Sequence, residues 1–404
     1  MNYLTHIRTG FLLLLISCVH LTPSQDGFAE EPQWKAGSAS VVITPEEDLW
    51  MAGYGGRKAP ADGKIHDLWL KVLVIEARDG HRGVVVSTDT LGIPQSIYNN
   101  VCAALKEKFN LERSQIMLNS SHTHCGPVLR GALHDVYPLT PEHIKQINSY
   151  SDKLEQKLVD AVGTALKNLE PATLWTGEGF TSFAVNRRNN MEPDVPKLRK
   201  ADELKGPSDH SVPVLAVKDK TGKLKTIVFG YACHNTTLGI QQWCGDYAGF
   251  AQYDLEAMFP GATAMFYMGC GADQNPLPRR TQELAESYGS RLAHAVADTV
   301  RLPMVELDPE LKTEIEIVDI KLGDAPTKAE LEKIAAGNPD SYITRWGTRL
   351  LKQLNAGKPF ITAYPFPVQT WFLGNRQIWI TIGGEVVVDY ALGMKKEFGP
   401  STWV

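Results

Sequence analysis

Residues 83–127 read GVVVSTDTLGIPQSIYNNVCAALKEKFNLERSQIMLNSSHTHCGP, and they decide the fold. Apolar, β-rich runs at 83–87 and 116–119 flank a stretch at 95–109 whose apolar residues recur with helical spacing. Strand and helix patterns keep alternating along the rest of the chain. Such alternation predicts an α/β fold, a single large domain around a mixed β-sheet with flanking helices.

The remaining expected elements follow the same two patterns. A helix expected at 140–169 opens with Thr140-Pro141-Glu142, a capping residue followed by proline at the first helical position. The region 329–357 is expected to form a helical insertion or a lid over the sheet. Further strands are expected at 39–43, 69–75, 212–217, 226–231, 262–267, 313–322, 360–370 and 377–382, and a further helix at 280–300.

The composition is that of an ordinary globular protein. Of the 404 residues, 43% are hydrophobic and 22% are charged, which excludes disorder, collagen and coiled coil as descriptions of the whole chain. The net charge of −5 comes without a long run of one sign, so we expect no nucleic-acid partner. Length alone allows one to three domains. Candidate site residues fall on both sides of every linker, which favours one domain over residues 36–404.

The N-terminus has the pattern of an export signal. Arg8 precedes an apolar stretch at 10–21 that is too short to span a membrane. We expect either a signal peptide at 1–29 or a lipoprotein signal ending before Cys18, which would then be acylated. The protein is therefore expected to be exported, as a periplasmic, secreted or lipid-anchored protein. Contact with a membrane surface is compatible with each of these locations.

Five cysteines follow this signal, an odd number that leaves at least one thiol unpaired in a monomer. They form no dense disulfide framework and no C-x-x-C pair. We interpret each as a small buried hydrophobic residue, although a thiolate metal ligand is conceivable for the three near the motifs described below. They are Cys102, Cys125, Cys233, Cys244 and Cys270.

The strongest local signal for chemistry is the pair His122 and His124, directly after the strand expected at 116–119. Residues i and i+2 of a strand project from the same face, so both imidazoles can converge at the strand end. Such a pair suits zinc or another transition metal. The alternative is two hydrogen-bonded histidines at a sheet edge.

Three further motifs also follow apolar strands. His234 ends the run YACH, Asp273 and Asn275 lie in the turn GCGADQNP, and Glu385 follows the strand expected at 377–382. Taken singly, they could be a structural histidine, a tight turn and a surface carboxylate. Two histidines and one carboxylate are, however, the ligand set of many catalytic zinc sites. Their shared placement at strand ends is the reason to expect that they meet.

The order of these motifs, NSSHTHCGP at 119–127, ACH at 232–234, GCGADQNP at 269–276 and GGE at 383–385, resembles the neutral/alkaline, non-lysosomal ceramidase family. The segments MAGYG at 51–55 and VSTDTLG at 86–92 extend the resemblance, which runs from about residue 36 to the C-terminus.

The resemblance implies a zinc-dependent amidohydrolase that cleaves the N-acyl amide bond of a ceramide-like lipid with metal-activated water. It makes His122, His234 and Glu385 the zinc ligands. His124 then matches the histidine beside the zinc-bound water and would move the proton. Arg187 matches an arginine of the substrate site; its alternative is a solvated surface arginine.

The sequence departs from the family in two ways, at Asn275 and in the missing tyrosine beyond Glu385. Asn275 stands where the family has a serine proposed as nucleophile, which favours direct attack by water and leaves Asn275 as a substrate contact. Asp273 is expected to orient a histidine through its ring N–H. The family also has a tyrosine ligand some dozens of residues beyond the glutamate, whereas only 19 residues follow Glu385. We therefore expect the sequence to be cut within the domain.

Two other functions stay open at this point. One is a zinc hydrolase of the same fold acting on a different amide or ester, for example from a polysaccharide or peptidoglycan. The other is an exported binding or scaffold protein on a catalytically decayed hydrolase fold, motivated by Asn275 and the missing tyrosine. The oligomeric state is left open.

Overall fold

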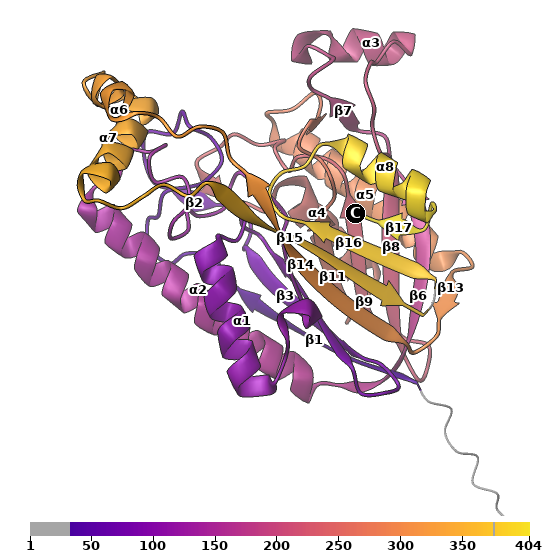
Figure 1. Ribbon diagram of the computed structural model, residues 1–404. Coiled ribbons are helices and arrows are strands. Elements are labelled where there is room, and N and C mark those ends of the chain that lie inside the picture. The colour runs from indigo at the N-terminus through magenta and orange to yellow at the C-terminus, as the bar shows by residue number, and fades with distance from the viewer. Residues whose placement is uncertain (1–32, 375) are drawn as a thin grey trace, which may run out of the picture. The chain divides into compact units, whose positions relative to one another are not determined.

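A nine-stranded mixed sheet forms the centre of the computed structural model, which describes residues 33–374 and 376–404 (Figure 1). The expected signal segment and Cys18 lie outside the described residues. Neighbouring strands run antiparallel except in the parallel pairs β11–β9 and β4–β5. Along the sheet the strands are β11 (Thr263–Met268), β9 (Leu224–Tyr231), β8 (Ser211–Asp219), β6 (Glu170–Phe180), β1 (Trp34–Val42), β3 (Trp69–Glu76), β4 (Arg82–Thr88) and β5 (Ile116–Ser120), and β13 (Val305–Leu307) pairs with β6.

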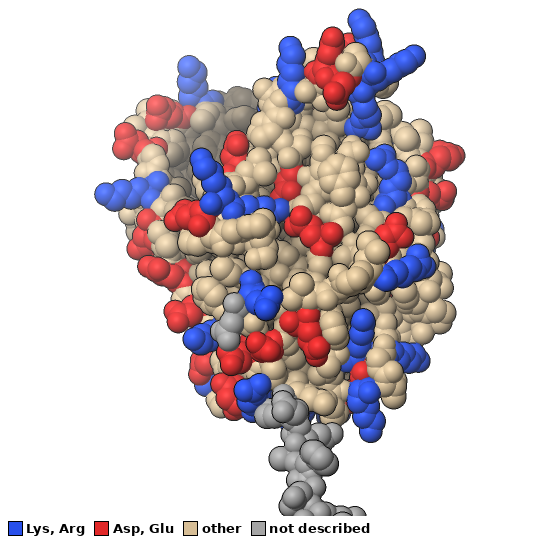
Figure 2. Space-filling view, turned by 90° about the vertical axis from the view of Figure 1, so that its right-hand side faces the viewer, with Lys and Arg blue, Asp and Glu red and all other residues tan. Residues whose placement is uncertain are grey.

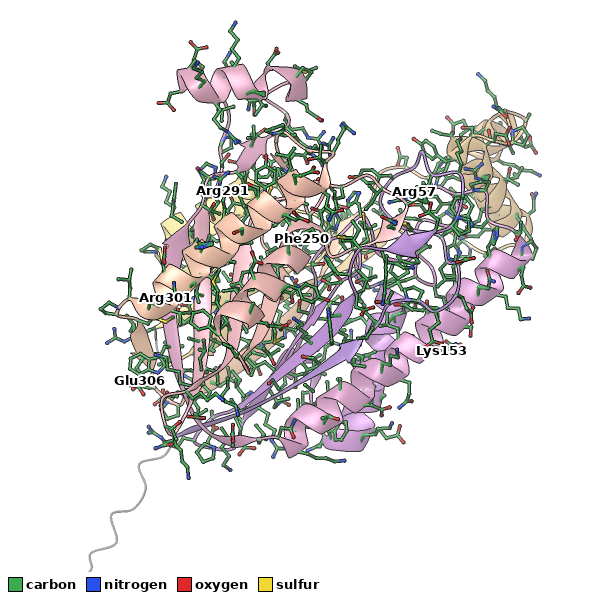
Figure 3. The ribbon with its side chains drawn as sticks, turned by 180° about the vertical axis from the view of Figure 1, so that it is seen from behind. Arg57, Lys153, Phe250, Arg291, Arg301 and Glu306 are labelled. Atoms are coloured by element: carbon green, nitrogen blue, oxygen red, sulfur yellow. The ribbon has the colours of Figure 1, made fainter. Side chains whose placement is uncertain are left out.

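Helices cover one face of this sheet. Helix α2 (Pro141–Lys167) packs on β1 and β3, and α1 (Gln95–Phe109) packs against α2. Both helices share a core with Val84 and Val86 of β4. Helices α4 (Asp246–Met258) and α5 (Gln282–Arg301) pack on β8, β9 and β11. Figure 3, drawn from behind, shows α5, which carries Arg291 and Arg301, and α4, which carries Phe250, in front of the sheet. The alternating side-chain directions of a strand send Val85 to the opposite face, where a second core lies.

A four-stranded sheet covers that opposite face. Its strands are β14 (Leu311–Lys321), β15 (Ala363–Leu373), β16 (Gln377–Ile382) and β17 (Thr402–Trp403). Trp371, Trp379 and Trp403 pack between the two sheets, with stacked rings inclined by 8° and 13°. The apolar chain end is thus part of this core, because Trp403 is 4% exposed. The fold therefore has three layers, which are the helices, the large sheet and the small sheet.

The predicted mixed α/β fold is confirmed, and the expected strands and helices recur within a few residues of their predicted bounds. The sequence patterns missed β6, because Gly177 and Gly179 interrupt its run. Both positions require glycine: a Cβ atom there would lie 2.8 Å from Thr299 Cγ2 and 2.7 Å from the Ala295 carbonyl oxygen of α5.

The remaining elements are short. The region 329–357 forms the helix pair α6 (Lys328–Ala335) and α7 (Tyr342–Asn355), and Arg345 of α7 donates hydrogen bonds to the carbonyls of Asp135 and Val136. The others are β2 (Gly63–Lys64), β7 (Ala184–Asn186), β10 (Gln242–Trp243), β12 (Gln274–Pro276), α3 (Val195–Ala201), α8 (Val388–Phe398) and the 3-10 turns η1 (Arg113–Gln115) and η2 (Glu192–Asp194).

The residues that the structure describes from position 33 onward make one compact unit. On the face drawn in Figure 2, acidic and basic side chains are interspersed. Among the described helices, we find none that combines the length and the apolar character needed to cross a bilayer.

Candidate metal centre

Three segments that are far apart in sequence meet at the ends of their strands. His122 follows β5, His234 follows β9 and Glu385 follows β16. The two carboxylate oxygens of Glu385 lie 3.7 Å from His122 Nε2 and 3.4 Å from His234 Nε2. In a tetrahedral zinc site with bonds of about 2.1 Å, neighbouring ligand atoms are about 3.4 Å apart. The spacing of these atoms therefore fits one metal ion held between them.

Backbone carbonyls fix the tautomers of two of the histidines. His122 Nδ1 lies 2.7 Å from the Leu91 carbonyl oxygen, and His234 Nδ1 lies 2.7 Å from that of Gly271. A carbonyl can only accept a hydrogen bond, so both Nδ1 atoms carry the proton and both Nε2 lone pairs face Glu385. Burial and the neighbouring His234 lower the pKa of His122, which keeps it neutral. This is the arrangement that metal-ligating histidines adopt.

The backbone at His122 differs from the predicted strand geometry. Strand β5 ends at Ser120, and His122 has a φ of +57°, in the left-handed region that non-glycine residues rarely occupy. His122 and His124 therefore do not project from one face of a strand, as the sequence pattern predicts, although their Nε2 atoms do lie 3.4 Å apart. Left-handed backbone at a functional residue is a common form of local strain. Here it turns the imidazole toward the other site residues.

His124 lies beside the other two histidines but is held differently. The ligand atoms of His122, His124 and His234 all lie within 4.8 Å of one another, so three histidines form a second conceivable ligand set. Unlike the other two, His124 has a buried Nδ1 with no hydrogen-bond partner among the described residues. Because ligating histidines almost always donate from their second ring nitrogen, His124 fits a proton carrier better than a ligand.

The segment 53–57 packs tightly around His124. The Tyr54 ring lies 4.7 Å from the imidazole, and Arg57 donates a hydrogen bond of 2.7 Å to the His124 carbonyl oxygen. A Cβ atom at Gly53, whose φ is +99°, would lie 2.4 Å from the imidazole ring. Burial, followed by the charges of His122 and His234, lowers the pKa of His124 to about 2. The family resemblance includes this segment, but residue type alone indicates no role for Gly53, Tyr54 or Arg57.

The prediction that Asp273 orients a histidine is wrong. The ring N–H groups of His122 and His234 are taken by backbone carbonyls. The Asp273 carboxylate instead accepts hydrogen bonds of 2.9 Å from Asn186 Nδ2 and from the Val388 backbone N–H. The neighbouring Ala272 N–H donates to the Val386 carbonyl at 3.0 Å. The turn after β11 thus ties down the segment that follows Glu385.

We expect Asp273→Asn to weaken metal binding by about 10- to 100-fold, the usual effect of losing a residue that positions a ligand. The side chain of Glu385 is 57% exposed, so its position depends on the hydrogen bonds that hold the following segment, residues 386–388, against the turn of Asp273. The zinc dissociation constant, measured by competition with a chromogenic chelator, tests this. Asp389→Asn, an exposed carboxylate one residue beyond Val388, is the matched control and should bind zinc like the wild type. Equal affinities for all three proteins would contradict the role given to Asp273.

Arg187 and Asn275 lie together next to the metal centre. Arg187 directly follows β7, and Asn275 lies in its partner strand β12. Arg187 Nη1 is 3.5 Å from Asn275 Oδ1, and Arg187 Nη2 is 2.6 Å from the Ala272 carbonyl oxygen. Burial lowers the pKa of Arg187, and the charge of Glu385 acts in the opposite direction. A freely solvated surface arginine is therefore a poor description of Arg187. Its buried Nε has no hydrogen-bond partner among the described residues and can donate to a ligand.

The cysteines do not contribute to the site. All five that follow residue 33 are buried and free. Burial raises the pKa of Cys125 and of Cys270 to about 12, which disfavours a thiolate ligand. Within the described part of the chain, no cysteine belongs to the group of histidines that could hold a metal.

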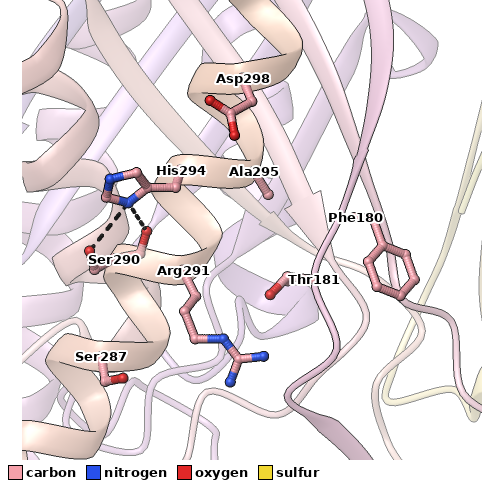
Figure 4. Close-up of a pocket in the computed structure, with 8 residues that line it drawn as sticks. All are labelled: Phe180, Thr181, Ser287, Ser290, Arg291, His294, Ala295 and Asp298. Atoms are coloured by element: carbon pink, nitrogen blue, oxygen red, sulfur yellow. Dashed lines mark hydrogen bonds between the residues drawn. The ribbon is translucent and has the colours of Figure 1, made fainter.

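A surface depression of about 500 Å³ lies elsewhere, between α5 and the end of β6 (Figure 4). Arg291, His294 and Phe180 line it, together with small polar side chains, and His294 Nδ1 donates to the Ser290 carbonyl of its own helix. It shares no residue with the histidine cluster, so we do not assign the chemistry to it.

Comparison with known proteins points in one direction. A family model described as neutral/alkaline non-lysosomal ceramidase, N-terminal, matches residues 34–272, which include His122 and His234 but not Glu385. The neutral ceramidase of Pseudomonas aeruginosa is 28% identical over 264 residues, which cover 62% of this chain and 37% of that protein.

Two solved structures share the fold. The crystal structure of neutral ceramidase from Pseudomonas aeruginosa matches with a TM-score of 0.69 and 20% identity, over 91% of this chain and 65% of that one. A structure described as ceramidase complexed with C2 matches with a TM-score of 0.68 and 20% identity, over 91% and 66%. The chain thus spans just under two thirds of the length of these solved chains.

Proposed function

The chain belongs to the neutral/alkaline non-lysosomal ceramidase family, and we propose that it is a zinc-dependent hydrolase that cleaves the N-acyl amide bond of a ceramide-like lipid. The convergence of His122, His234 and Glu385 at three strand ends carries the proposal. Two fixed imidazole lone pairs and a carboxylate are a donor set that suits zinc and leaves a position open. When bound there, zinc would lower the pKa of a water molecule to about 7 and polarise the scissile carbonyl.

His124 is the residue proposed to move protons. Its Nε2 lies 3.4 Å from His122 Nε2, at the edge of the metal centre, and burial keeps the imidazole neutral, so one ring nitrogen carries a lone pair that can face the attacking water. In the proposed reaction His124 takes a proton from the attacking water and gives it to the departing amine. Gly53 and Tyr54 hold the ring in place for both transfers.

Arg187 and Asn275 are proposed to bind the substrate around the reacting carbonyl. The free N–H of Arg187 and the side-chain amide of Asn275 can donate to the oxygen on which negative charge develops. Asn275 has no nucleophilic oxygen of the serine type, so the proposed route is direct attack by water without a covalent acyl intermediate.

The substrate and the setting are proposals of their own, because a fold and a metal site do not fix a substrate. A lipid amide follows from the family, and an exported enzyme that meets its substrate at a membrane surface follows from the expected signal. Hydrolysis of a different amide or ester on the same fold is the competing function, since Asn275 replaces a serine of the family.

A comparison of substrates tests the proposed function. Purified, zinc-loaded protein is offered N-palmitoylsphingosine, N-acetylglucosamine and an N-acetylated muropeptide, and the released acid is quantified. We expect turnover of the lipid amide and at least about tenfold lower kcat/KM for the other two. Preferential turnover of an amino sugar would establish the competing function, and no turnover of any substrate by zinc-loaded protein would support a binding protein.

A further inference from the structure

A two-stranded ribbon extends from the small sheet beyond the metal centre. The last residue pair between β15 and β16 is Val368 with Ile382. Beyond this pair the Gly383 N–H still donates to the Pro367 carbonyl, and from Val318 opposite Phe366 to Lys321 opposite Ala363, β14 and β15 pair with no other described strand. In Figure 1 this part of the ribbon runs on toward α6 and α7. Its side chains are therefore open to solvent on both faces.

One face of this ribbon is a continuous apolar strip. Val318 lies opposite Phe366 and Ile320 opposite Tyr364, and directly opposed residues share a face. Val318, Ile320 and Tyr364 are 41%, 44% and 43% exposed. The charged residues Asp319 and Lys321 alternate onto the other face. We call Val318, Ile320, Tyr364 and Phe366 the ribbon strip.

The ribbon strip begins at the metal centre. A Cε atom of Phe366 lies 3.6 Å and 3.9 Å from where a Cβ atom of Gly383 and of Gly384 would be, and these glycines directly precede Glu385. From Phe366 the strip extends outward past Tyr364, and at about 3.3 Å per residue it runs on the order of 10 Å. An apolar surface that starts beside the reacting centre suits the part of a substrate next to the scissile bond.

We propose that the ribbon strip binds the acyl chain of the lipid amide, with the amide itself at the metal centre. This rests on the proposed function. Solvent-exposed apolar residues that stand alone need no explanation, but an uncharged row of aliphatic and aromatic side chains marks a binding surface. The continuity of the row with the segment that carries Glu385 argues for a substrate chain as its occupant.

The test pairs a strip variant with a matched control. The double variant Ile320→Ser/Tyr364→Ser removes the centre of the strip. The control is Phe372→Ser, which removes an aromatic residue of equal exposure, 42%, from the same face at the far end of β15, where it pairs with Lys312. Thermal unfolding shows whether each variant folds, and Ile320→Leu keeps the strip apolar and should behave like the wild type.

Two readouts separate this inference from the proposed function. Calorimetric titration with palmitate and hexanoate measures chain binding without turnover: we expect the double variant to lose at least about tenfold in palmitate affinity and the control to lose less than about twofold. In turnover, kcat/KM for N-palmitoylsphingosine should fall at least about tenfold in the double variant, while that for N-acetylsphingosine stays within about twofold.

Unchanged palmitate affinity in the double variant would overturn the inference, as would equal losses in variant and control. Equal losses on both sphingosine amides would do so too, because the sphingoid base rather than the acyl chain would then occupy the strip. If the double variant bound phosphatidylcholine vesicles more weakly but kept its palmitate affinity, the inference would also be wrong, and the ribbon strip would be a membrane contact. Palmitate binding that depends on the strip, without turnover of any lipid amide, would support the inference and refute the proposed function.

Discussion

Glu385→Gln is expected to lower the proposed amidase activity by at least about a thousandfold at limiting zinc, equivalent to roughly 4 kcal/mol of transition-state stabilisation. The substitution keeps the size of the side chain but removes the negative charge that lies 3.4 Å and 3.7 Å from the two imidazole nitrogens. A neutral amide is a weaker zinc ligand than a carboxylate, so metal affinity should fall as well. Zinc content after dialysis and the initial rate on N-palmitoylsphingosine are measured on the same sample.

Glu397→Gln is the matched control for this variant, because Glu397 is an exposed carboxylate further along, in α8. It should keep both zinc and activity. A Glu385→Gln protein with the zinc content and rate of the wild type would remove Glu385 from the metal centre and leave the three histidines as the ligand set.

His124→Gln is expected to separate metal binding from catalysis. If His124 carries protons and does not bind the metal, the variant retains zinc at the wild-type affinity while kcat falls by about 10²- to 10⁴-fold, the usual contribution of a general base and acid. Glutamine keeps a polar side chain of similar reach but cannot accept and release a proton. The measurements are the zinc dissociation constant and kcat at saturating substrate.

The control here is His294→Gln, which changes an exposed histidine of α5 in the depression of Figure 4. It should alter neither quantity. Loss of zinc from His124→Gln, comparable to that in a His122 or His234 variant, would instead show that His124 is a ligand.

The positions of the site residues along the chain were predictable because each follows an apolar strand. His122, His234 and Glu385 each follow such a strand, which strand periodicity and residue type alone can indicate. That they meet was less predictable, because β5 and β9 lie near opposite ends of the strand order in the large sheet and β16 belongs to the small sheet. The same logic placed Asn275 near the site, on a turn after a strand.

The way each residue is held could not be predicted in this manner. The partners of His122 and His234 are backbone carbonyls, which every residue carries, so no side-chain pattern identifies them. The role of Asp273 depends on the backbone N–H of Val388, 115 positions away, and on Asn186. The left-handed turn at His122 likewise has no signal in its residue type, since such backbone favours glycine.

Zinc removal and return in the wild-type protein, with hydrolysis of N-palmitoylsphingosine as the readout, tests the proposed metal centre most directly. We expect a chelator to abolish the release of palmitate and one equivalent of zinc to restore it, whereas His122→Ala should neither retain the zinc nor regain the rate. Full palmitate release by metal-free wild-type protein, or full zinc content and activity in His122→Ala, would contradict the proposed metal centre.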